Sequence, residues 1–153
     1  GRAIQPEMKE VLRELAAEGA VLLENKVLPL RPETKLAVFG RCQQDYFFTG
    51  YGSGGDVCSP YRVSLLEGLR NAGALQIDEE LAATYQRWVA EHPVDHGVWG
   101  HWPRCYPEMP VTPSMIQEAA IRNEAALIVI GRSSGEDRDS TLEKGSLLPI
   151  YAN

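Results

Sequence analysis

The chain has 153 residues, 44% of them hydrophobic, and a formal net charge of −6. This is enough apolar material for one globular domain with a packed core. The acidic balance and the scattered basic residues argue against a nucleic-acid-binding surface. No apolar run approaches the ~20 residues that a membrane span needs. We therefore expect neither nucleic acid nor a membrane as a partner.

The cysteines bear on the compartment in which the protein works. Cys42, Cys58 and Cys105 are odd in number and widely spaced, which fits neither a disulfide framework nor a zinc site. We interpret them as buried or loop thiols in a reducing compartment. Residues 1–6 lack the apolar core of a signal peptide. We expect a cytoplasmic location, with export of a longer precursor left open.

The first predicted element is an amphipathic helix from Pro6 to about Asn25. Its apolar residues recur at spacings of three and four, which places them on one helical face: Met8, Val11, Leu12, Leu15, Ala16, Ala20, Val21 and Leu23. Pro6 suits the first turn, while Pro29 and Pro32 prevent continuation. The short apolar run Lys35–Gly40 then predicts a buried parallel strand.

Later elements continue this alternation. We predict a short helix at Ser64–Asn71, a weak strand at Leu75–Ile77 and a helix capped by Asp78 that runs from 79 to about Glu91. Another helix follows at Ser114–Glu124, and a second strong, buried strand at Ala126–Gly131. The inward-facing residues of the first and last of these helices are Leu65, Leu66, Leu69, Met115, Ala119 and Ile121. The order indicates an α/β fold, a three-layer α/β/α sandwich with a largely parallel sheet. About three strands are visible, so the sheet looks incomplete.

A glycine-rich segment, Gly50–Gly55, lies ten residues beyond the first strand. Such a turn can hold phosphate at a helix N-terminus, but these glycines neither follow the strand directly nor open a helix. Close passage of the backbone near a ligand or another domain accounts for them better than nucleotide binding does.

Residues 94–113 are rich in Pro, Gly and aromatic residues and lack periodicity, which is typical of a functional or disordered loop. His92, His96 and His101 superficially resemble a metal set, but no carboxylate completes a shell, and we favour histidines without metal. Three aromatic residues have two open interpretations, stacking on a sugar ring or forming the loop's own core: Trp99, Trp102 and Tyr106.

Glu136 is the most interesting acidic residue. It follows Ser134-Gly135 beyond the apolar strand predicted at Ala126–Gly131, and ligands of open α/β sheets bind outside the carboxyl ends of strands. Asp137 and Asp139 would raise the pKa of Glu136, and Arg138 would lower it. A protonated carboxyl group is what a general acid for a glycosidic oxygen requires. The alternative from the residues alone is a solvated charged loop.

Several segments, taken in order, resemble the C-terminal α/β-sandwich domain of glycoside hydrolase family 3, the β-glucosidase and β-xylosidase type. Leu15–Leu30 is similar to the segment with which the family's domain begins, Lys35–Gly40 to its first strand and Gly50–Gly55 to its glycine-rich loop. Ser64–Gly68 is similar to its next helix, and Ile128–Ser140 to the strand and loop that carry the acid/base. The combination covers most of residues 11 to 142. In one departure, Glu136, Asp137 and Arg138 are contiguous, which leaves the choice between Glu136 and its neighbours open.

The resemblance implies a retaining β-glycosidase that hydrolyses terminal non-reducing sugars. Such enzymes use two carboxyl groups about 5–5.5 Å apart, a nucleophile and a general acid/base. The resemblance assigns the acid/base to Glu136 and places the nucleophile, with much of the sugar site, on a preceding (β/α)8 barrel. Substrate binding near the cleft is expected of Gly52, Ser53, Gly54 and Arg138. No metal and no cofactor are implied.

We accordingly expect residues 1–145 to form part of the sandwich domain, with 146–153 as a divergent tail and the barrel absent. The partners implied are a β-glucoside or oligosaccharide and the missing barrel, and the chain alone is expected to be inactive. An open sheet edge could also pair two copies of the chain. The alternative is a non-catalytic binding or interaction module with the same sandwich.

Overall fold

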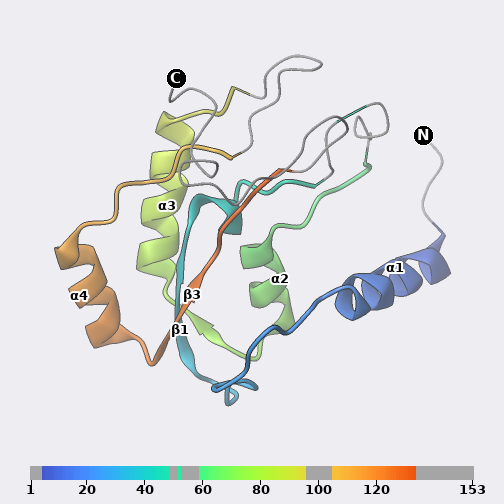
Figure 1. Cartoon of the computed structure of the whole chain (residues 1–153), viewed down its shortest axis with the longest axis horizontal. Helices are drawn as coiled ribbons and strands as arrows, with labels where there is room; N and C mark the ends of the chain where they lie inside the picture. Colours follow the sequence, from blue (N-terminus) through green and yellow to red (C-terminus); the bar gives the residue numbers. More distant parts are fainter. Residues whose placement is uncertain (1–4, 49–51, 53–58, 96–104, 134–153) are drawn as a thin grey trace. The chain divides into compact units, whose positions relative to one another are not determined.

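A computed structural model of the chain describes residues 5–48, 52, 59–95 and 105–133 (Figure 1). It divides into two compact units, residues 1–30 and 31–153. In the first unit, α1 (Pro6–Glu18) begins at a proline and carries Glu7 in its first turn, where an acidic side chain favours the helix dipole. The helix ends with Gly19, whose N–H donates to the Leu15 carbonyl at 2.9 Å.

The predicted extension of this helix to Asn25 is wrong, because residues 20–25 are not helical. Asn25 instead organises a turn: its Oδ1 accepts hydrogen bonds from the N–H groups of Val27 and Leu28, at 3.1 and 2.8 Å. An Asn side chain that bonds to the following backbone competes with helix formation. The helical spacing of apolar residues thus extends to Leu23, although the helix itself ends at Glu18.

The second unit is built on a three-stranded sheet of order β2-β1-β3. The central strand β1 (Lys35–Phe39) pairs in parallel with β2 (Gln76–Ile77) and β3 (Ala125–Ile128). The register aligns Leu36 with Ile77 and Val38 with Leu127. A parallel sheet crossed by helices confirms the predicted α/β sandwich.

Local capping fixes where the helices of the second unit begin. The helix α2 (Leu65–Ala72) has a capping box between Ser64 and Glu67, and α3 (Glu79–Glu91) begins after Asp78, whose Oδ1 accepts from the Leu81 N–H at 3.0 Å. Thr112 caps α4 (Pro113–Arg122) through its Oγ1. Short polar side chains at these positions satisfy backbone N–H groups that the first turn leaves free.

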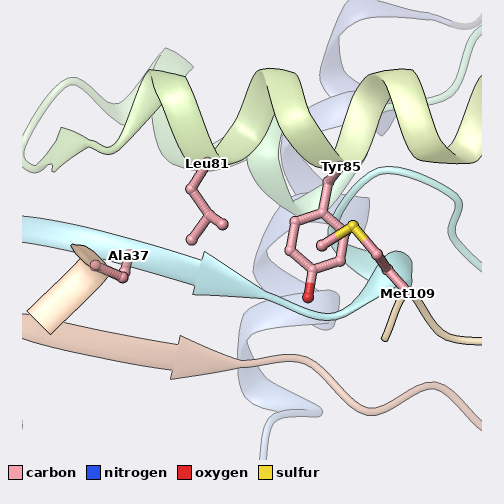
Figure 2. Close-up of a cluster of buried hydrophobic side chains, with 5 residues drawn as sticks. Ala37, Leu81, Tyr85 and Met109 are labelled. Atoms are coloured by element: carbon pink, nitrogen blue, oxygen red, sulfur yellow. The ribbon is translucent and has the colours of Figure 1, made fainter. Parts of the chain in front are cut away.

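The helices lie on both faces of the sheet, with α2 on one side and α3 and α4 on the other (Figure 1). Ala37 projects toward α3 and α4 and belongs to the buried cluster in Figure 2, which also contains Leu81, Tyr85, Met109 and Ala119. Successive side chains of a strand point to opposite faces, so Leu36 and Val38 project to the side on which Leu66 of α2 is buried.

Two expectations about burial are wrong. Ile121 of α4, expected to face inward, is 78% exposed, and Ile128 and Ile130 of the second strong strand are 70% and 72% exposed. In the part of the chain that the structure describes, β3 has β1 on one side and no strand on the other, so fewer neighbouring side chains are available to cover Ile128 and Ile130. Within the described residues, no helix is both long and apolar enough to cross a membrane.

Candidate functional site

The carboxyl edge of the sheet is the end at which β1 stops and the chain beyond β3 leads toward Glu136. Gly40 follows β1 with φ 102°, and a Cβ at this position would collide with the Val129 carbonyl oxygen. The Val129 N–H donates to the Phe39 carbonyl at 2.8 Å, so the two segments stay paired beyond the last residue of β3. Glycine is required here both for its backbone conformation and for this close approach.

Arg41 opens a short 3-10 helix, η1 (Arg41–Gln43), and its side chain is only 1% exposed. Its Nη2 donates to the His92 carbonyl at 2.7 Å, its Nη1 to the Pro107 carbonyl at 3.3 Å, and its Nε to Asp45 Oδ2 at 2.9 Å. The Arg41 N–H donates to Glu108 Oε2 at 2.7 Å. One buried guanidinium thus joins both ends of the 93–106 segment to the end of β1.

Gly131 passes directly against η1. A Cβ on Gly131 would collide with the Cys42 Sγ and lie 3.3 Å from Phe47 Cδ2. On the other side of Cys42, the Gln43 side chain is fully buried and its Nε2 donates to the Val38 carbonyl at 2.8 Å. Residues directly after β1 therefore form the wall along which the chain runs toward the proposed acid/base.

The thiol of Cys42 is held in its protonated form. Burial raises its pKa to about 11, and the Glu108 and Asp45 carboxylates act in the same direction, against the Arg41 and Arg132 cations. The pKa of Cys105 is also raised, chiefly by burial. Both thiols are buried, so the prediction of buried or loop thiols is confirmed for these two cysteines. Cys58 lies outside the described residues.

Tyr106, the one aromatic residue of the 94–113 segment within the described part of the chain, packs into the protein. The Tyr106 ring is 6% exposed and stacks on Phe47 with centroids 4.1 Å apart. This supports the local-core interpretation for Tyr106. The His92 ring stacks on Trp88 and its Nδ1 lies 2.8 Å from the Trp88 carbonyl. Trp99, Trp102, His96 and His101 lie outside the described residues.

Most of the residues predicted to form the site also lie outside the described part of the chain: Glu136, Ser53, Gly54 and Arg138. Gly52 is described; it is buried and has φ 123°, a conformation that favours glycine. The described residues contain no group of three or more His, Cys, Asp or Glu side chains that could hold a metal ion.

A second feature of the surface is an open pocket of about 410 Å³ at the opposite, amino edge of the sheet. Arg122 in its lining pairs with Asp78 and Glu80, and Asp78 Oδ2 accepts hydrogen bonds from Arg122 Nη2 at 3.1 Å and Asn123 Nδ2 at 2.7 Å. Ligands of parallel sheets bind at the other edge. The full lining consists of Lys35, Gln76, Ile77, Asp78, Glu80, Ile121, Arg122 and Asn123. We therefore assign the site to the carboxyl edge.

The sequence interpretation did not place Arg41, Cys42 or Glu108 at the site, although it predicted Cys42 to be a buried or loop thiol. The signal was present for the first two, because polar residues that directly follow the glycine at the end of a buried strand lie where ligands bind. This rule was applied to Glu136 beyond the second strong strand but not to the end of the first. Glu108 had no such signal, since its contact with Arg41 spans 67 residues of sequence.

Residues 20–146 match the glycosyl hydrolase family 3 C-terminal domain. The chain belongs to this family. It is 43% identical over 144 residues to a beta-glucosidase of Ruminococcus albus, a match that covers 93% of this chain and 15% of that protein. Its fold, an α/β sandwich with a small parallel sheet, is that of solved family members.

Two solved structures illustrate this likeness. A beta-glucosidase from Paenibacillus barengoltzii is 42% identical with a TM-score of 0.87, over 94% of this chain and 16% of the other. Beta-glucosidase 3B from Thermotoga neapolitana, in complex with alpha-D-glucose, is 37% identical with a TM-score of 0.74, over 91% of this chain and 20% of the other. The chain thus spans about 15–20% of the length of these relatives.

Proposed function

We propose that the chain is part of the C-terminal sandwich of a retaining β-glucosidase and supplies its general acid/base, Glu136. One observation carries this proposal: in a family 3 domain, the chain beyond β3 runs along the carboxyl edge through Gly131 toward Glu136. That edge is where open α/β sheets bind ligands. A carboxyl group there can protonate the leaving glycosidic oxygen and later activate water.

The remaining parts of the reaction are proposed to lie elsewhere. The nucleophile, and most of the pocket for the terminal β-glucose, belong on the preceding barrel that the family resemblance implies. Residues 52–54 and Arg138 would border the cleft from this side. We therefore propose that the isolated chain does not hydrolyse β-glucosides, since one carboxyl group cannot perform the two-step displacement.

Three further features of the proposal concern the chain as a whole. We assign residues 1–145 to the sandwich and 146–153 to a divergent tail. The buried thiols of Cys42 and Cys105 fit a reducing compartment, so we propose a cytoplasmic location. Among the described residues β3 is an outer strand, and we propose that two copies can pair through this edge, which sedimentation at high concentration tests.

The experiment is a chimera in which this chain replaces the matching segment of the Ruminococcus albus beta-glucosidase. We expect no turnover from the chain alone and hydrolysis of alkyl β-glucosides by the chimera. Glu136→Gln should lower kcat/KM for an alkyl β-glucoside by about 10²–10⁴-fold, the usual contribution of a general acid. It should affect 2,4-dinitrophenyl β-glucoside much less, because that leaving group needs no proton.

Matched substitutions at the neighbouring carboxylates decide which residue is responsible. Asp137→Asn and Asp139→Asn should each leave the leaving-group dependence of the chimera unchanged. If Asp137→Asn instead reproduces the loss expected for Glu136→Gln, the acid/base is Asp137. A folded chimera that hydrolyses neither substrate would support the non-catalytic module.

A further inference from the structure

The backbone at Gly131 packs against side chains of the segment that follows β1, Cys42 and Phe47. Gly131 lies five residues before Glu136, and Cys42 and Phe47 occupy the space that a side chain at Gly131 would need. Any shift of Phe47 therefore changes the surface against which this backbone packs. Packed interiors transmit such shifts because they leave no free volume.

Phe47 is itself held by a stack of groups, which we call the Arg41 stack and define as Arg41, Tyr106 and Phe47. The rings of Phe47 and Tyr106 are nearly parallel, with an interplanar angle of 25° and centroids 4.1 Å apart. The Arg41 guanidinium lies over the Tyr106 ring, 5.7 Å from its centroid. Ring stacking and cation–π contact both favour one relative orientation of these groups.

The base of the stack is fixed by hydrogen bonds. Arg41 donates to the carbonyls of His92 and Pro107 and to the Asp45 carboxylate, so its guanidinium plane is held in three directions. A planar guanidinium with several satisfied donors has little rotational freedom. The stack thus transmits the position of η1 and of the 105–109 segment to the backbone at Gly131.

We propose that the Arg41 stack positions the loop that carries Glu136, so that Phe47, Tyr106 and Arg41 are positioning residues for proton transfer. This inference rests on the proposed function, in which Glu136 is the acid/base. Its chemical reason is geometric: a misplacement of about 1 Å far from the reacting atoms can cost ~10²-fold in rate. The residues of the stack act through Gly131 and need no contact with substrate.

The test uses the chimera and the variant Phe47→Leu. We expect kcat/KM for an alkyl β-glucoside to fall about tenfold or more, with 2,4-dinitrophenyl β-glucoside hydrolysed at an almost unchanged rate. Tyr106→Leu should have the same selective effect. Phe48→Leu is the matched control, because the adjacent Phe48 ring contacts Tyr46 and Arg62.

Equal losses for both substrates in Phe47→Leu, or a selective loss in Phe48→Leu of the same size, would overturn the positioning role. Failure of the proposed function looks different. In that case Glu136→Gln in the same chimera would show no dependence on the leaving group. If Glu136→Gln shows that dependence and Phe47→Leu does not, only the positioning role is wrong.

Hydrogen exchange on the 153-residue chain itself gives a measurement that does not require activity. The Val129 N–H donates to the Phe39 carbonyl, so its exchange reports opening of this contact. Phe47→Leu should accelerate exchange of the Val129 amide about tenfold, as expected when a packed contact opens locally. The amides of β1 should keep their protection, and Phe48→Leu should leave both unchanged. Unchanged exchange of the Val129 amide in Phe47→Leu would also overturn the positioning role.

Discussion

At the amino edge of the sheet the buried charge is a carboxylate, and at the carboxyl edge it is a guanidinium. Asp78 is 4% exposed and its cationic partner Arg122 is 35% exposed. Arg41 is 1% exposed and its anionic partner Asp45 is 27% exposed. Each edge therefore buries one member of an ion pair and leaves the other in partial contact with water.

The two edges differ in how the buried charge is satisfied. Asp78 caps the α3 N-terminus beside it and gains Arg122 and Asn123 from the end of α4. Arg41 takes carbonyl oxygens from positions 51 and 66 residues away, besides Asp45. A buried charge is tolerated only when its hydrogen bonds are complete. Both edges thus join distant segments, but the amino edge satisfies its buried charge with side chains of Arg122 and Asn123, whereas the carboxyl edge uses backbone carbonyls.

The largest expected effect comes from Arg41→Met. It leaves the carbonyls of His92 and Pro107 without their donor and Asp45 without its cation, so we expect unfolding free energy to fall by about 3–5 kcal/mol. Urea denaturation followed by circular dichroism measures this. Arg41→Lys keeps the charge but not the fork of donors, and should be intermediate. A loss below about 1 kcal/mol in Arg41→Met would remove the distinction between the edges.

Asp78→Asn tests the amino edge and should cost about 1–3 kcal/mol at pH 7, because an amide replaces a charged acceptor. Burial raises the pKa of Asp78, but hydrogen bonds from Leu81, Asn123 and Arg122 outweigh it and hold the pKa below its usual range. Its carboxylate therefore stabilises the fold fully above the unfolded pKa of about 3.9. That contribution disappears as the pH falls through the lowered folded pKa.

Urea titrations at a series of pH values check this sign. The difference in stability between the parent chain and Asp78→Asn should be largest near neutrality and shrink below about pH 4. Glu80→Gln is the control, since Glu80 is exposed and lies 3.6 Å from the same Arg122. A difference that grows on acidification would contradict the lowered pKa.

The smallest effect is expected for Arg31→Met, which removes an exposed ion pair with Glu124 at the amino edge. Solvent screens both charges, so the change should stay within about 0.5 kcal/mol. The measurement can be repeated in about 0.5 M salt, where the Debye length falls below the ~8 Å of physiological ionic strength. Under these conditions the parent chain and Arg31→Met should have the same stability. If Arg31→Met lowers the unfolding free energy as much as Asp78→Asn does, solvent exposure does not explain why one ion pair at this edge is stronger than another.

Elements governed by neighbouring residues were predictable. The run Lys35–Gly40 located β1, and Ser64 and Asp78 located the starts of α2 and α3. The predictions failed where distant contacts decide. The apolar spacing of Ile121 and Ile128 resembled that of buried residues, but the described fold leaves both exposed. Periodicity reports which residues share a face, and cannot report whether another element covers that face.

By itself, the sequence determined the alternation of strands and helices, the caps, and the resemblance that points to family 3 and to Glu136. These depend on residues close together in the chain, or on motifs kept in order. Only the tertiary structure brought Arg41 to His92 and Pro107, and Gly131 to Cys42 and Phe47. Such contacts join segments separated by dozens of residues, and local propensity carries no information about which distant groups will complete the hydrogen bonds of a buried charge.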